Sequence, residues 1–192
     1  MKNNKTILII LVLILSTAFF WFTANRFLYP SRAGSKQLGV SFEQKQNNVS
    51  LSSGQTDFPV NIFLTTPPET QVTGATAVLR YNSQFVEYSE QDEIFTDSSC
   101  QNASFKFTKR VKVINDTDSG TLIITRIVDL ASTILPSGRT CWGTVIFRAK
   151  QSGSSTVSFE TTDTSAWEIV GPASVYMPRF DEPRFVNIIT SE

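Results

Sequence analysis

Histidine is absent from this chain of 192 residues. Its absence excludes nucleophiles that need a histidine base and zinc sites that need imidazole ligands. An excess of one charge is also lacking, because 17 Lys and Arg residues balance 17 Asp and Glu residues. A neutral chain has no basic footprint for nucleic acid. We therefore expect no enzyme, no cofactor, no metal site and no nucleic-acid partner.

Long apolar runs are also scarce, and the one exception lies near the N-terminus. Residues 6–23 contain no charged residue, proline or glycine. About 18 residues of helix reach about 27 Å, close to the ~30 Å hydrocarbon core of a bilayer. We expect one transmembrane helix here, with residues 1–5 in the cytoplasm, because Lys2 and Lys5 obey the positive-inside rule. The remainder would then lie outside the membrane.

A signal peptide is the alternative for the same segment. Cleavage after Ala18, at the small residues 16–18, would release a secreted protein. The aromatic residues 19–22 favour the retained anchor, since they suit the outer interface of a membrane. We therefore predict a single-pass membrane protein with an extracytoplasmic C-terminal domain.

Cysteine is scarce, with only Cys100 and Cys141 in the chain. Both follow the predicted anchor, so we expect an oxidising environment and a disulfide between them. The disulfide would close a loop of about 40 residues and add about 3–4 kcal/mol to the stability of the domain in the chain-entropy model. The spacing does not fit a redox-active CxxC pair.

Composition divides the rest into three parts. Residues 24–38 contain Pro, Gly, Ser and scattered charges without periodicity, which predicts a linker. Residues 39–178 have the length of one domain. Residues 179–192 are expected to form a C-terminal tail with two Pro-Arg-Phe motifs. Two interpretations of this tail stay open: a docking peptide for a partner, or a segment that packs back onto the domain.

Beyond residue 38, apolar residues recur with period two, and no stretch shows a convincing helical period. The clearest strand covers residues 58–64, where Phe58, Val60, Ile62 and Leu64 alternate with other residues, and the prolines at 67–68 end it. Further strands are expected at 40–42, 49–51, 72–81, 85–88, 105–113, 121–127, 142–149, 156–159 and 175–177. The pattern predicts an all-β, jelly-roll-like β-sandwich of about eight or nine strands.

Two acidic segments are candidate sites. Residues 116–120 (DTDSG) match part of a calcium loop, but Thr125 and Arg126 stand where a bidentate Glu is needed, so a hairpin turn is expected. Residues 87–93 hold four carboxylates in a loop-like segment, which favours a solvated loop over a catalytic pair.

Residues 77–87 (AVLRYNSQFVE) resemble the cohesin-family signature, in which an apolar strand ends in Tyr-Asp-Pro before a short strand. This chain has Tyr-Asn-Ser at residues 81–83. Residues 143–150 (GTVIFRAK) and 155–159 (STVSF) look like the late hairpin of that family. The similar stretches fall within residues 49–177.

The resemblance implies a non-catalytic binding domain with the jelly-roll fold shared by cohesins and related carbohydrate-binding modules. Cohesins proper bind dockerins, so it implies a protein partner of dockerin type. Dockerin-recognising cohesins place polar residues on the strand before the Tyr-Asp-Pro element, and Gly74 and Thr76 stand at about those positions here. These two residues are the implied ligand contacts.

Two other functions stay open. A polysaccharide could stack on exposed aromatic rings, and Trp167 is the candidate contact because it alone among the candidate rings lies in a polar context. A structural subunit of a surface assembly is the third class. We favour a binding or adhesion module displayed on a bacterial cell surface.

Overall fold

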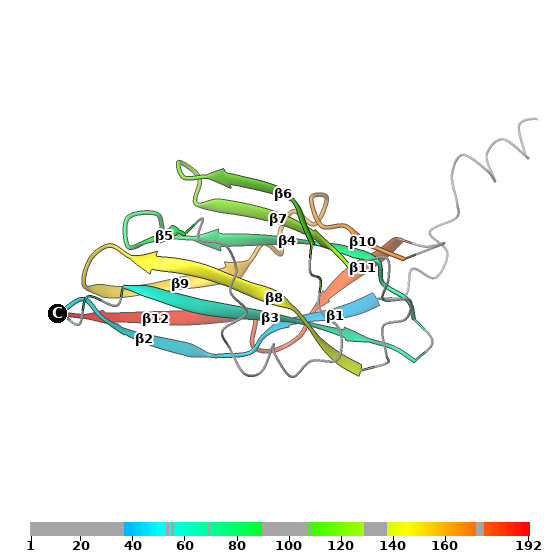
Figure 1. The fold of residues 1–192 in the computed structure, drawn as a ribbon, viewed down its shortest axis with the longest axis horizontal. Helices are drawn as coiled ribbons and strands as arrows, with labels where there is room; N and C mark the ends of the chain where they lie inside the picture. Colours follow the sequence, from blue (N-terminus) through cyan, green and yellow to red (C-terminus); the bar gives the residue numbers. More distant parts are fainter. Residues whose placement is uncertain are drawn as a thin grey trace, which may run out of the picture. The chain divides into compact units, whose positions relative to one another are not determined.

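The computed structural model describes residues 37–52, 54, 56–68, 70–89, 107, 109–128, 138–171 and 175–192. These residues form a β-sandwich of two sheets (Figure 1). The all-β prediction is confirmed. No helix long and apolar enough to cross a membrane occurs among these residues. The predicted anchor at residues 6–23 and nearly all of the predicted linker lie outside them.

The first sheet has five strands in the spatial order β11–β1–β3–β8–β5. Neighbours are antiparallel except β1 and β11, which are parallel. Its strands are β1 (Gln37–Phe42), β3 (Asp57–Thr66), β5 (Val86–Tyr88), β8 (Gly138–Ala149) and β11 (Val175–Phe180).

The second sheet has the order β6–β7–β4–β9–β12–β2, and β12 and β2 are its parallel pair. Its strands are β2 (Gln46–Ser50), β4 (Gly74–Tyr81), β6 (Lys109–Asp116), β7 (Thr121–Ile127), β9 (Gly153–Phe159) and β12 (Phe185–Ser191). The short β10 (Ile169–Val170) pairs with the start of β4 and with β11. Since β11 goes on to pair with β1, it joins the two sheets.

The core lies between the sheets and follows the alternation of the sequence. Phe58, Val60, Ile62 and Leu64 of β3 are all buried, as the period-two pattern predicts. From the second sheet, β4 contributes another alternating set: Ala75, Ala77, Leu79 and Tyr81. Each strand thus buries one continuous face.

An aromatic cluster fills part of this core. The rings of Phe42 and Phe159 stack with their centroids 3.9 Å apart. Phe180 lies 5.7 Å from Phe159, and Trp167 meets both of these rings edge-on. The cluster joins β1, β9, β11 and the loop before β10.

A β-bulge interrupts the pairing of β3 and β8. Ile62 pairs with Gly143 and Phe63 with Cys141, so Trp142 is the extra residue. Trp142 is buried and donates its indole N–H to the carbonyl of Ala75 over 3.1 Å. Gly143 has a φ of 155°, and a Cβ there would collide with the guanidinium of Arg126. The bulge therefore makes room in the core for the Trp142 ring and the guanidinium of Arg126 to pack against each other.

At the C-terminus, the structure supports the second of the two interpretations, a segment that packs back onto the domain. Part of the predicted tail is β12, which pairs over six residues with β9 and over five with β2. Phe180 belongs to β11, and the second Pro-Arg-Phe motif leads into β12. The last 14 residues therefore belong to the sandwich, because Val186 and Ile188 supply inward side chains that the second sheet needs.

Candidate binding face

The outer face of the second sheet carries a row of side chains that crosses five strands. Asp116 pairs with Thr121, Thr121 with Arg80, Arg80 with Ser158, and Ser158 with Phe185. Directly paired residues point to the same side of a sheet. The row therefore runs from a carboxylate through a central arginine to an aromatic ring.

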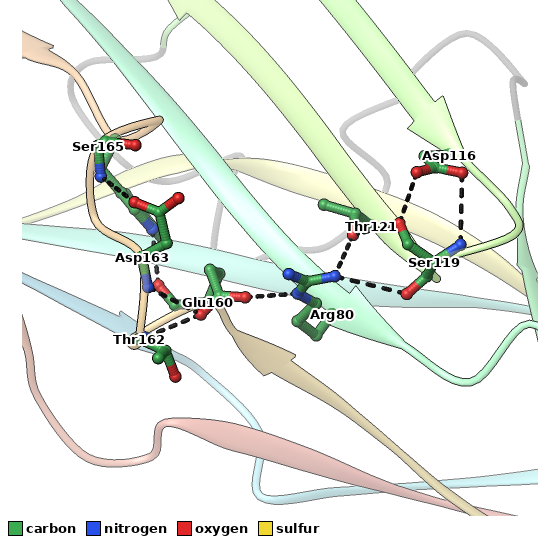
Figure 2. Close-up of polar contacts among 9 residues, drawn as sticks. Arg80, Asp116, Ser119, Thr121, Glu160, Thr162, Asp163 and Ser165 are labelled. Carbon is green, nitrogen blue, oxygen red and sulfur yellow. Dashed lines mark hydrogen bonds and ion pairs between the residues drawn. The ribbon is translucent and has the colours of Figure 1, made fainter.

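Arg80 joins this row to the loop after β9 (Figure 2). Its Nε donates to Oε2 of Glu160 over 2.5 Å, and its Nη1 donates to the Thr121 hydroxyl and, over 3.5 Å, to the Ser119 carbonyl. The other oxygen of Glu160 accepts the N–H of Thr162 over 2.8 Å. One guanidinium thus fixes the β6–β7 turn and the loop that starts at Glu160.

Glu160 accepts three hydrogen bonds in this network, from the side chain of Arg80 and from the N–H groups of Thr162 and Asp163. The hydrogen bond from Arg80 lowers the pKa of its carboxyl, burial opposes that shift, and the N–H groups of Thr162 and Asp163 add to it. The Asp163 carboxyl also has a lowered pKa, chiefly because Ser165 donates to it. Both carboxylates are therefore stabilised in the charged form.

The β6–β7 connection is a hairpin turn, as predicted. Asp116 accepts the N–H groups of Asp118 and Ser119 over 3.1 and 3.3 Å and the Ser119 hydroxyl over 2.7 Å. These bonds lower the pKa of the Asp116 carboxyl. Gly120 has a φ of 63°, and a Cβ there would collide with the Tyr81 carbonyl. The carboxylate stabilises its own turn.

Replacement of Glu160 by Gln should weaken the acid dependence of stability. Because the folded pKa of this carboxyl lies below its ordinary value of 4.5, its contribution is present above that value. The contribution is lost as pH falls through the folded pKa. Urea unfolding between about pH 5 and pH 3 should show a shallower loss of unfolding free energy in Glu160→Gln.

Arg80→Met serves as the partner variant for this measurement. It should remove much of the same acid dependence of the unfolding free energy. The variant that combines Glu160→Gln and Arg80→Met should show little further loss of that dependence. A full wild-type slope in Glu160→Gln would contradict the assignment.

Beside this network, β6, β7 and β4 present apolar and basic side chains outward; we call the outward residues of these strands the hairpin face. Ile114 pairs with Ile123 and Ile123 with Val78, and Lys112 pairs with Thr125. Ile114 is 43% exposed. The same side continues through Gly74 and Val170 to Val175, which is 61% exposed. The exposed part of this face lies on β6, where Ile114 and Lys112 are accessible beside the half-buried Ile123, whereas Val78 and Gly74 of β4 are buried.

Comparison with known proteins adds evidence at the level of fold. No family model and no curated protein sequence matches the chain. Two solved structures from Acetivibrio cellulolyticus are similar over 81% of this chain. They are the sixth cohesin of scaffoldin B with a Cel5 dockerin mutant (TM-score 0.51, 14% identity) and the third cohesin ScaC with the ScaB dockerin (TM-score 0.52, 10% identity). Each match covers 100% of the other chain.

A third similar structure is the Coh-OlpC–Doc435 type I cohesin–dockerin complex of Clostridium thermocellum. Its TM-score is 0.52 at 12% identity, over 81% of this chain and 95% of the other. The domain has a cohesin-like fold. This confirms the resemblance inferred from residues 77–87 and 143–159.

The cohesin-like domain does not present Gly74 and Thr76 as surface contacts. Both are buried, and Gly74 pairs with Ile127 on one side and Val170 on the other. Thr76 shares a 3.0 Å hydrogen bond with the Thr125 hydroxyl. Both residues lie on β4 as expected from the sequence, but they are not accessible to a partner.

Trp167 corrects another expectation. The ring is 6% exposed, lies in the aromatic cluster, and donates its N–H to the Glu160 carbonyl over 2.8 Å. Its polar neighbours Asp163 and Ser165 form an exposed turn, after which the chain returns to the core. Trp167 therefore offers no stacking surface to a sugar.

The structure describes only one of the two cysteines of the predicted disulfide. Cys141 is fully buried in β8, whereas Cys100 lies outside the described residues. The pairing of the two cysteines stays a prediction.

Sequence reasoning missed a buried cation in the cohesin-like domain. Arg126 of β7 is fully buried, with its guanidinium carbon 4.8 Å from the centre of the Trp142 ring and Nη2 donating to the Thr144 carbonyl over 3.2 Å. Burial lowers the pKa of Arg126 to about 10. The sequence contained a signal for this burial, because Arg126 alternates in phase with the inward residues Leu122 and Ile124 of β7.

Proposed function

We propose that this domain is a non-catalytic module that binds a protein partner of dockerin type on the hairpin face. The observation that carries the proposal is that exposed Ile114 and half-buried Ile123 lie beside exposed Lys112 on the outer side of the sheet. Exposed apolar side chains rimmed by charges are typical of protein-binding surfaces. The proposal needs no catalytic residue.

The cohesin-like fold supports a protein partner. The similar structures from Acetivibrio cellulolyticus and Clostridium thermocellum are described as complexes with dockerins. The outer face of a sheet suits a folded partner better than a small molecule, which prefers a concave pocket. A hollow lined by Gly54, Thr56, Asp57 and Arg148 belongs to the first sheet instead, since Asp57 lies on β3 and Arg148 on β8.

We further propose that residues 6–23 hold the domain outside a bacterial membrane, or direct its secretion if cleavage follows Ala18. The apolar run and the two preceding lysines support this placement. A Cys100–Cys141 disulfide would fit the oxidising exterior.

The hairpin face can be tested with a matched pair of variants. Ile114→Asp should raise the Kd for dockerin modules such as those of the similar complexes by roughly tenfold or more, because it places a charge in an apolar contact. Ile189→Asp is the control, since Ile189 has the same 43% exposure but lies on β12. Biolayer interferometry on the full-length chain in detergent measures both.

An equal effect of the two variants would contradict the hairpin face. Failure of the wild-type chain to bind any dockerin module would overturn the dockerin-type partner.

A further inference from the structure

The other half of the second sheet has a different surface chemistry. Strands β9, β12 and β2 contain no Asp, Glu, Lys or Arg, although 18% of the whole chain is charged. By contrast, the single strand β6 carries four charged residues: Lys109, Arg110, Lys112 and Asp116. We call the outward residues of β9, β12 and β2 the neutral strip: Gln46, Asn48, Ser50, Ser154, Thr156, Ser158, Phe185, Asn187, Ile189 and Ser191.

Strand register arranges the neutral strip in successive rungs. Ser158 lies opposite Phe185, and the next rung joins Thr156, Asn187 and Gln46. The rung after it joins Ser154, Ile189 and Asn48, and Ser191 lies opposite Ser50. Every rung therefore offers a hydroxyl or an amide, at a spacing of about 7 Å along the strands.

The strip combines polar side chains with two exposed apolar ones. Gln46 donates to Asn48 over 2.8 Å, which orients both amides on the surface of β2. Phe185 is 49% exposed and Ile189 is 43% exposed. Four residues of strand place them about 13 Å apart on the same face. An extended chain lying along β12 would meet a ring, then an amide, then an aliphatic side chain.

We infer that the neutral strip binds an uncharged polysaccharide. Amides and hydroxyls both donate and accept, as sugar hydroxyl groups require, and an aromatic face packs against the C–H face of a pyranose ring. A strip without ionisable groups matches a polymer without charge, whereas the hairpin face has charges suited to a protein. The neutral strip borders the hairpin face at the Arg80–Ser158 pair but consists of other strands, and the inference does not depend on the proposed protein partner.

Affinity electrophoresis of the full-length chain tests the inference, with neutral β-1,4-glucan, β-1,3-glucan and mannan in the gel as probes and polygalacturonate as the anionic control. A polyoxyethylene detergent is required, because sugar-based detergents would compete. At least one neutral polymer should retard the chain, and polygalacturonate should not. Phe185→Ser and Asn187→Ala should each weaken that retardation roughly tenfold.

Ile114→Asp on the hairpin face is the matched control and should be retarded like the wild-type chain. Circular dichroism of each variant shows whether β12 still folds; Ser158→Ala and Gln46→Ala, which change outward side chains on other strands, repeat the test. The inference is overturned if none of the three neutral polymers retards the chain, or if the strip variants bind as the wild-type does. It is also overturned if the strip variants lose binding to a dockerin module but keep binding to the polysaccharide.

Discussion

Removal of residues 185–192 is expected to prevent the domain from folding. The deletion takes β12 from between β9 and β2 and removes Val186 and Ile188, which are both fully buried. Each buried aliphatic side chain contributes about 1.5–3 kcal/mol, and the total stability of a domain is about 5–15 kcal/mol. The edges of β9 and β2 would also lose their backbone hydrogen bonds. Circular dichroism and limited proteolysis measure the loss.

A shorter truncation provides the control. Removal of Glu192 alone, which is exposed and follows β12, should leave the unfolding transition unchanged. If the chain without residues 185–192 unfolds like the full chain, β12 is dispensable for the fold and the prediction is wrong.

Replacement of Trp142 by Ala should cost about 3–5 kcal/mol of unfolding free energy, the range for large aromatic residues in cores. The ring is the bulge residue of β8, and its removal leaves a cavity beneath the buried guanidinium of Arg126. The Ala75 carbonyl would also lose its indole donor. Urea unfolding at neutral pH measures the change.

Trp142→Phe separates the two causes, because it keeps most of the volume but loses the N–H. Its cost should be about 1–2 kcal/mol, mainly the lost hydrogen bond and a weaker cation–π contact. Val111→Ala, on the exposed bulge of β6, should cost far less. An equal cost for Trp142→Ala and Val111→Ala would contradict the role of the ring.

Alternation of apolar residues predicted most strands because burial on one face acts locally on each strand. Phe58 to Leu64 and residues 121–127 were identified for this reason, and both are strands. β12 also alternates, with Val186, Ile188 and Thr190 buried, but the two Pro-Arg-Phe motifs drew attention to a terminal peptide. The prediction that the Trp167 ring is exposed was wrong for a similar reason, since polar neighbours in the sequence do not determine where a ring points.

The candidate face could not be predicted because it depends on register between distant strands. Arg80 and Glu160 lie 80 residues apart in sequence, yet one hydrogen bond joins them. The Asp116 turn is local, and its hairpin was predicted correctly. The neutral strip combines residues 46–50 with residues 153–191, a proximity that only the parallel pairing of β2 and β12 creates.

That parallel pairing has a mechanical consequence. β1 pairs with β11 and β2 with β12, so in each sheet an early strand runs alongside a late strand in the same direction. Tension between the start of β1 and the end of β12 would slide these strands past each other and strain many hydrogen bonds together. Antiparallel terminal strands would instead open one bond at a time. A domain tethered at its N-terminal side would thus withstand pulling at its far end.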